Sequence, residues 1–186
     1  MPGWRQILAF WFSLSHSQWF KNGRSIDADV RRMFGGVLHK AERGLLRHWA
    51  RHPRGFLALV IVLDQFSRHV YRGRLRAFSN DNKALALVLR YHQKYLPLLK
   101  TPEQQMFALL PLQHTKNLYA QRLGVRLLQS LVHKDPRSRT LREALKHQKG
   151  HLRVLKAFRR FPKRLPPHRR TAREQAYVAR TPGLPY

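Results

Sequence analysis

Apolar residues recur at steps of three and four along most of the chain, and no stretch shows the strict alternation typical of a half-buried strand. This spacing predicts an all-α protein. Seven or eight helices joined by short turns favour antiparallel neighbours, in a bundle or a short solenoid. The helices are expected over about 3–14, 25–45, 55–71, 81–96, 101–110, 115–133, 139–161 and 171–179, with Trp19 and Phe20 in a turn.

Two further features refine this pattern. The segment FLALVIVL at 56–63 is apolar almost all round, which indicates a central, buried helix. Thr101 with Gln104, and Thr171 with Glu174, have the spacing of a capping box, in which two side chains bond the free amides at a helix start. These two sites are therefore predicted helix N-termini.

Composition changes the picture mainly through charge. With 186 residues and 43% hydrophobic content, the chain can bury a core as one domain spanning 1–186. Its 37 Lys and Arg against 9 Asp and Glu give a net charge of +28, which makes a polyanion such as nucleic acid the first partner to consider.

The absence of cysteine excludes disulfides, thiolate metal sites and cysteine nucleophiles. The apolar runs are too short for membrane insertion, so a soluble protein of the cytoplasm, or of an organelle matrix in a eukaryote, is expected.

The predicted helix over 139–161 carries seven cations at alternating steps of three and four, which places them on one stripe roughly 30 Å long. Apolar residues occupy the opposite side, so the helix can pack and still expose the stripe. Glu143 is the one acid between Arg137 and Arg173, and the region 137–186 forms a strongly basic C-terminal helix and tail. The predicted nucleic-acid-binding residues are Arg139, Arg142, Lys146, Lys149, Arg153, Lys156, Arg160, Lys163, Arg164, Arg169, Arg170 and Arg173.

A solvated helix face usually mixes the two signs of charge, because like charges four residues apart cost a few tenths of a kcal/mol while Glu–Lys pairs gain about as much. A stripe of one sign therefore favours polyanion binding over a plain solvated face. No helix-turn-helix, zinc-finger or RNA-recognition signature accompanies it. Backbone contact with a folded RNA, for example ribosomal RNA, fits this pattern best.

The central helix ends in a polar cluster, Asp64, Gln65, Arg68 and His69. On a regular helix Asp64 would pair with Arg68 and Gln65 with His69, each four residues apart. In such a cluster the carboxylate could polarise a histidine, or Arg68 could clamp an anionic ligand that Gln65 orients. An internal ion pair that braces the fold is the alternative, and the lack of a second carboxylate or a recognisable nucleophile favours it.

Other chemistry has little support. The pairs His48/His52 and His147/His151 have the spacing of two metal ligands on one helix face, but acids that would complete a site are scarce. Phosphate-loop, dinucleotide-binding and nucleophile-elbow motifs are absent. The sequence therefore predicts no catalytic residues, no metal and no cofactor.

Several motifs occur in a characteristic order and spacing. They are FWF at 10–12, WF at 19–20, GLLRHW at 44–49, LALVIVLDQFSRHVYRG at 57–73, RAFSND at 76–81, LPLQH at 110–114 and HLRVLKAFRRFPKR at 151–164. In this arrangement the chain resembles the bacterial domain-of-unknown-function family 924. The resemblance spans nearly the whole sequence and implies an all-helical, tetratricopeptide-like fold, but it implies no activity.

The chain departs from the family pattern where that pattern holds polar residues. Ser67 stands where the family has proline, Gln113 and Lys116 replace acids beside His114, and Arg159 replaces a glycine. Lys163 and Leu165 replace a histidine and an asparagine of the same motif. If the family shares a site, it is weakened here. The residues available for such a pocket are Asp64, Gln65, Arg68, His114, His151 and Arg164.

Three hypotheses follow. The first is a non-catalytic helical scaffold that binds RNA or a ribonucleoprotein through the basic stripe. The second is an enzyme or small-ligand-binding protein that uses the polar pocket. The third is a helical module that binds an acidic protein.

Overall fold

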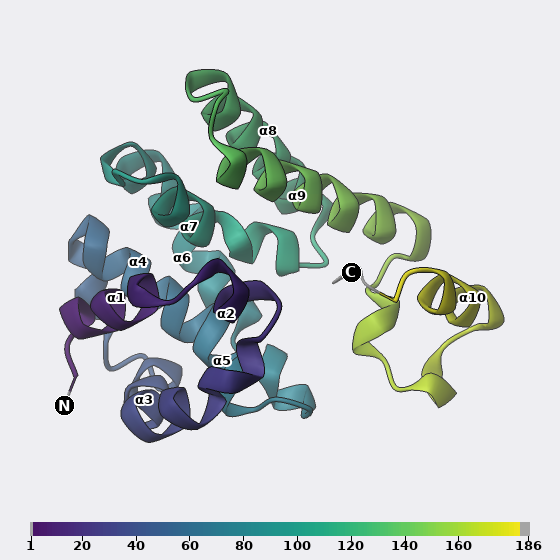
Figure 1. Cartoon of the computed structure of the whole chain (residues 1–186), viewed down its shortest axis with the longest axis horizontal. Helices are drawn as coiled ribbons and strands as arrows, with labels where there is room; N and C mark the ends of the chain where they lie inside the picture. The colour runs from purple at the N-terminus through teal and green to yellow at the C-terminus, as the bar shows by residue number, and fades with distance from the viewer. Residues whose placement is uncertain (1, 183–186) are drawn as a thin grey trace. The chain divides into compact units, whose positions relative to one another are not determined.

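The computed structural model describes residues 2–182, and this range is helical, with no strand. It therefore confirms the predicted all-α class (Figure 1). The chain forms two compact units, which divide within helix α7 (Pro102–His114), between Pro111 and Leu112. That the chain folds as a single domain remains a prediction. Among the described residues, no helix is both long and apolar enough to cross a membrane.

Unit 1 is built on one long helix, in which α4 (Pro53–Ile61) continues through a π-helical turn (Val62–Phe66) into α5 (Ser67–Val70). The other α-helices are α1 (Trp4–Ser13), α2 (His16–Phe20), α3 (Asp27–Glu42), α6 (Asp81–Tyr95) and the greater part of α7. Short 3-10 turns lie at Gly23–Ile26, Arg47–Arg51, Leu75–Phe78 and Leu96–Leu98.

Aromatic side chains form the core of unit 1. Trp11, Phe34, Phe66 and Phe107 are fully buried. Phe34 stacks on Phe66 with ring centroids 5.1 Å apart, and Trp11 lies edge-on to Phe66 and Phe107 at 5.7 and 5.3 Å. Every residue over 55–67 is buried, which confirms the central helix predicted from its all-round apolar sequence.

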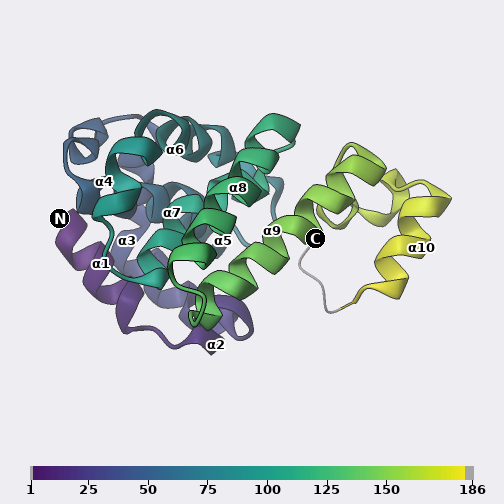
Figure 2. The same ribbon diagram turned by 90° about the horizontal axis from the view of Figure 1, so that it is seen from above.

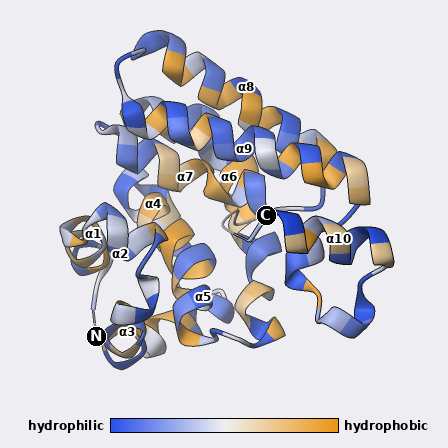
Figure 3. Cartoon of the chain, turned by 45° about the vertical axis from the view of Figure 1, so that its right-hand side comes forward, coloured by the Kyte–Doolittle hydropathy of each residue, from blue (hydrophilic) through white to orange (hydrophobic). Residues whose placement is uncertain are grey.

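Unit 2 centres on an antiparallel pair of helices, α8 (Leu118–Lys134) and α9 (Arg139–Phe158), which lie side by side (Figures 1 and 2). Hydrophilic and hydrophobic residues alternate along both (Figure 3). A buried amide pair joins them, since Gln148 Nε2 donates to Gln121 Oε1 over 2.8 Å. Two 3-10 turns, Pro162–Arg164 and Pro167–Arg169, lead to α10 (Ala172–Arg180).

The predicted capping boxes are largely present. At α10 the Thr171 hydroxyl accepts from the Glu174 amide and the Glu174 carboxylate from the Thr171 amide. At α7 the Thr101 hydroxyl accepts from the Gln104 amide, but the Gln104 side chain bonds the amide of Lys100 instead. Local sequence therefore placed both helix starts correctly.

Two expectations about helices were wrong. Trp19 and Phe20 lie in α2, which the Ser15 hydroxyl caps, so with α4 and α5 counted as one rod the described residues hold nine α-helices and not seven or eight. Helix α9 ends at Phe158 and not at Phe161, because Arg159 adopts a left-handed conformation with φ of 58°.

Arg159 is the one non-glycine residue with positive φ among the described residues. A side chain there is disfavoured because Cβ approaches the following carbonyl oxygen. We expect Arg159→Gly to raise the free energy of unfolding by about 0.5–1 kcal/mol, since glycine adopts this conformation freely. Urea denaturation would measure the change. Arg159→Ala keeps the strain and should show no such gain.

Candidate functional site

The solvent face of α9 carries six of the seven predicted stripe cations as exposed side chains. They are Arg139, Arg142, Lys146, Lys149, Arg153 and Lys156, which we call the α9 stripe. The one acid on the helix, Glu143, lies 3.9 Å from Lys146. Lys149, Arg153 and Lys156 form no hydrogen bond or ion pair with another described side chain. These three charges are therefore available to an outside anion.

The helix that carries the stripe is held by its other face. Leu141, Ala144, Val154 and Leu155 are buried there, and the Ser138 hydroxyl caps the helix by accepting from the Leu141 amide. The apolar and basic positions follow the same 3.6-residue period on opposite sides, so packing fixes the direction of the stripe.

The predicted interface cations beyond the stripe fall into two groups. Arg169 and Arg173 are exposed. The other four are partly buried and bonded within unit 2: Arg160 to Glu174 over 2.6 and 2.7 Å, Lys163 to the Thr181 carbonyl, Arg164 to the His114 carbonyl over 3.0 Å, and Arg170 to the Pro162 carbonyl over 3.0 Å. Residues 183–186 of the predicted basic tail lie outside the described residues.

The Arg160–Glu174 pair makes unit 2 sensitive to acid. The bidentate bond from Arg160 and the Thr171 amide lower the pKa of Glu174 from 4.5 to about 2. A carboxyl group whose pKa is lower in the folded state stabilises the protein above pH 4.5, and this contribution is lost as the pH falls toward 2. We expect Glu174→Gln to flatten the fall in melting temperature between pH 4.5 and 2. If the variant shows the same fall in melting temperature over this pH range, the Arg160–Glu174 pair does not cause the acid sensitivity.

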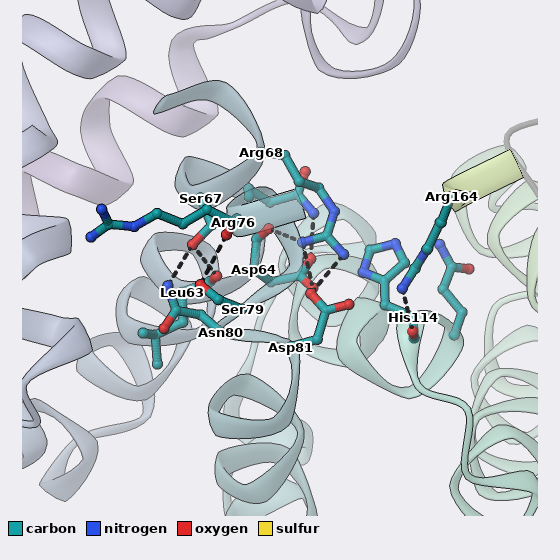
Figure 4. A network of polar contacts seen from close by, with 12 residues as sticks. Leu63, Asp64, Ser67, Arg68, Arg76, Ser79, Asn80, Asp81, His114 and Arg164 are labelled. Atoms are coloured by element: carbon teal, nitrogen blue, oxygen red, sulfur yellow. Dashed lines mark hydrogen bonds and ion pairs between the residues drawn. The ribbon is translucent and has the colours of Figure 1, made fainter. Parts of the chain in front are cut away.

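In unit 1 the predicted polar cluster belongs to a partly buried network around Arg68 (Figure 4). Arg68 Nη2 bonds Asp81 Oδ1 over 2.9 Å, and Arg68 Nη1 lies 3.5 Å from Asp64 Oδ1 and also bonds the Asp64 carbonyl. Asp64 is only 1% exposed. Beside them Asn80 donates to the buried Ser67 hydroxyl over 2.9 Å. The Asp64–Arg68 pair predicted from spacing is therefore present, as a brace between the central helix and the start of α6.

The predicted partnership of Gln65 with His69 was wrong. Gln65 Nε2 donates to Asp64 Oδ2 over 2.5 Å, while His69 Nδ1 lies 2.8 Å from Asp27 Oδ1, on α3. A spacing of four therefore brought Asp64 and Arg68 together but not Gln65 and His69, because His69 is bonded to a residue of another helix. Burial lowers the pKa of His69 below its usual value, despite the opposing effect of Asp27.

Unit 2 holds the remaining members of the predicted pocket. The rings of His114 and His151 lie 6.0 Å apart, and Arg164 lies over the Phe161 ring at 4.6 Å. Burial, with His114 and Arg164 nearby, lowers the pKa of His151 to about 3. His151 is therefore neutral at physiological pH and poorly matched to proton transfer there.

The two histidine pairs lie in different surroundings. His48 lies in a 3-10 turn and His52 is extended, so their spacing of four is not that of one α-helix face. His151 Nδ1 bonds the His147 carbonyl over 2.9 Å. Within residues 2–182, no three His, Asp or Glu side chains are grouped so as to hold a metal ion.

One pocket in unit 1 was predicted only in part. Gln65 and Arg68, which were predicted to line a pocket, do so around a volume of about 290 Å³, together with the segment from Trp19 to Arg24, which was not predicted. That segment, WFKNGR, combines aromatic, basic and glycine residues, and this composition was the signal available in the sequence.

Comparison with known proteins gives a family and a fold. The family model described as "Bacterial protein of unknown function (DUF924)" matches residues 7–182. The solved structure of a protein of unknown function, ATU0120 from Agrobacterium tumefaciens, is similar with a TM-score of 0.84 and 24% sequence identity, over 95% of this chain and 97% of that one. No curated protein matches significantly. With nearly its whole length matched by the family model, this chain belongs to the DUF924 family of bacterial proteins.

Proposed function

We propose that the protein is a non-catalytic helical scaffold that docks on RNA or a ribonucleoprotein through the α9 stripe. The observation that carries this proposal is a row of six exposed cations on one packed helix, with Glu143 as the one acid on that helix. Like charges at these spacings weaken a helix by a few tenths of a kcal/mol per pair. Phosphates placed along the row would remove that repulsion and release counterions.

RNA fits better than the other polyanions for two reasons. The charge lies along a rod, which suits contact with successive phosphates, and no recognition motif for base edges accompanies it. We propose a tetratricopeptide-like arrangement of the helices as the frame that presents the rod. Arg169 and Arg173, which are also exposed, extend the basic surface beyond α9.

The salt dependence of RNA binding tests the proposal. If all six stripe cations contact phosphates, the logarithm of the association constant should fall against the logarithm of salt concentration with a slope of about −4, taking about 0.7 per contact. Fluorescence anisotropy with a labelled, folded RNA would measure this slope between about 50 and 300 mM salt. A flat response would contradict the proposal.

An acidic protein partner is the alternative for the same surface. A pull-down with the full chain, with and without nuclease, separates the two. Loss of the bound partner on nuclease treatment supports RNA or a ribonucleoprotein, and an unchanged protein partner supports the alternative.

A further inference from the structure

We propose that unit 1 binds a small organic phosphate that carries a planar ring, in the pocket lined by the Trp19–Arg24 segment and by Gln65, Arg68, His69 and Arg72. The volume of about 290 Å³ lies at the lower end of the range for small-molecule sites, roughly 300–1,000 Å³, so a ligand no larger than a mononucleotide fits it. All lining residues belong to unit 1, so this site is independent of the α9 stripe.

Charge at the pocket favours an anion. Lys21 and Arg24 are exposed, and neither side chain forms a hydrogen bond or ion pair with another described residue. Two further guanidinium groups line the pocket, those of Arg68 and Arg72. No carboxylate is among the lining residues. Arg68 and Arg72 are paired with aspartates outside the lining, so Lys21 and Arg24 supply the unpaired charge that an entering phosphate would meet.

Arg68 and Arg72 are both held in place by carboxylates that are not among the lining residues. Asp27 accepts from Arg72 Nε over 2.5 Å and from Arg72 Nη2 over 2.7 Å, which leaves Nη1 as a donor without a partner among the described residues. Asp64 and Asp81 fix Arg68 in the same way. Carboxylates that orient an arginine without entering the pocket reduce the entropy lost when a ligand binds.

Two aromatic side chains, Trp19 and Phe20, line the pocket and could contact a planar ring of the ligand. Phe20 is 47% exposed and stacks on Phe107, while Trp19 is half-buried and fixed by a bond of 2.9 Å from its Nε1 to the Trp11 carbonyl. An exposed aromatic face beside unpaired cations suits a planar group attached to a phosphate.

Two further features of the lining are a close backbone approach and a polar side chain. A Cβ at Gly23 would lie 3.3 Å from the Gln18 carbonyl oxygen, 3.4 Å from the His69 ring and 3.6 Å from Arg72 Nη2, so the backbone of the segment lies close against two of the lining side chains. Gln65 lies on the π-helical turn, and its side-chain nitrogen donates to Asp64. Its side-chain oxygen can therefore accept a hydrogen bond from a hydroxyl or amino group of a ligand. Such π-turns are often found at functional sites.

The test uses the full chain and adenosine 5′-monophosphate as the probe, with adenosine and inorganic phosphate as separate arms, in isothermal titration calorimetry. We expect saturable binding of one equivalent, with each half of the probe at least tenfold weaker. Lys21→Ala/Arg24→Ala should weaken binding at least tenfold. The matched control is Lys40→Ala/Arg43→Ala, which removes two exposed cations at the same spacing elsewhere in unit 1 and should change nothing.

Phe20→Ala tests the ring separately, because it should weaken the mononucleotide and leave inorganic phosphate unchanged. Absence of saturable binding, or equal losses in the two double variants, would overturn the site. Equal affinity for inorganic phosphate and the mononucleotide would overturn the ring assignment. Reversal of charges on the α9 stripe should leave this binding unchanged, so failure here is distinguishable from failure of the RNA proposal.

Discussion

Reversing three charges of the α9 stripe, Lys149→Glu/Arg153→Glu/Lys156→Glu, should lower RNA affinity roughly 100-fold at 0.1 M salt. Each lost phosphate contact removes about 0.7 from the slope of log association constant against log salt concentration. At 0.1 M salt this corresponds to a loss of about fivefold in affinity for each contact. The slope should therefore become shallower by about 2. Anisotropy titrations of both proteins over a salt series would measure both quantities.

The fold should survive this change, because all three side chains are exposed and none bonds another described residue. Circular dichroism would check it. The matched control is Lys40→Glu/Arg43→Glu/Arg54→Glu, which alters net charge equally through exposed residues of unit 1. If the control loses as much affinity as the stripe variant, binding depends on overall charge and the stripe has no special role.

Arg68→Ala should destabilise unit 1 by about 3 kcal/mol. Removing the cation from a buried pair typically costs 3–5 kcal/mol, because the carboxylate is left in a medium that solvates charge poorly. Asp64 is almost fully buried and Arg68 is 19% exposed, which places the expected loss at the lower end. Urea denaturation followed by tryptophan fluorescence would report it, since all four tryptophans lie in unit 1.

The control for this prediction is Arg32→Ala. Arg32 pairs with Asp29 over 2.8 Å, but the side chains are 73% and 50% exposed. Exposed pairs contribute only about 0–1 kcal/mol. Equal losses in the two variants would show that the Arg68 network is not the brace we infer from its geometry.

Local pattern predicted much of the fold. The all-round apolar sequence of 56–63 identified the central helix, and the spacing of Thr171 and Glu174 identified a helix start. Both depend on interactions within a few residues, which a sequence displays directly. Helix α2 was missed because five residues are too short to show a periodicity, although Ser15 and Gln18 form a capping box there.

The candidate sites were less predictable. Regular spacing correctly placed the α9 stripe on one exposed face and Asp64 beside Arg68. It failed for His69, whose partner Asp27 lies 42 residues away on another helix. No local signal marked the π-helical turn at Val62–Phe66, on which Gln65 bonds its neighbour Asp64.

The sequence by itself determined the helical class, the family, and the direction of the basic face, because each follows from periodicity or from ordered local motifs. Tertiary structure decided which charges are free. It bound Arg160 to Glu174, paired Arg68 and Arg72 with aspartates, and left Lys21 and Arg24 exposed at a pocket. The physical reason is that the energy of a charge depends on its neighbours in space and on its burial, and packing between distant segments fixes both.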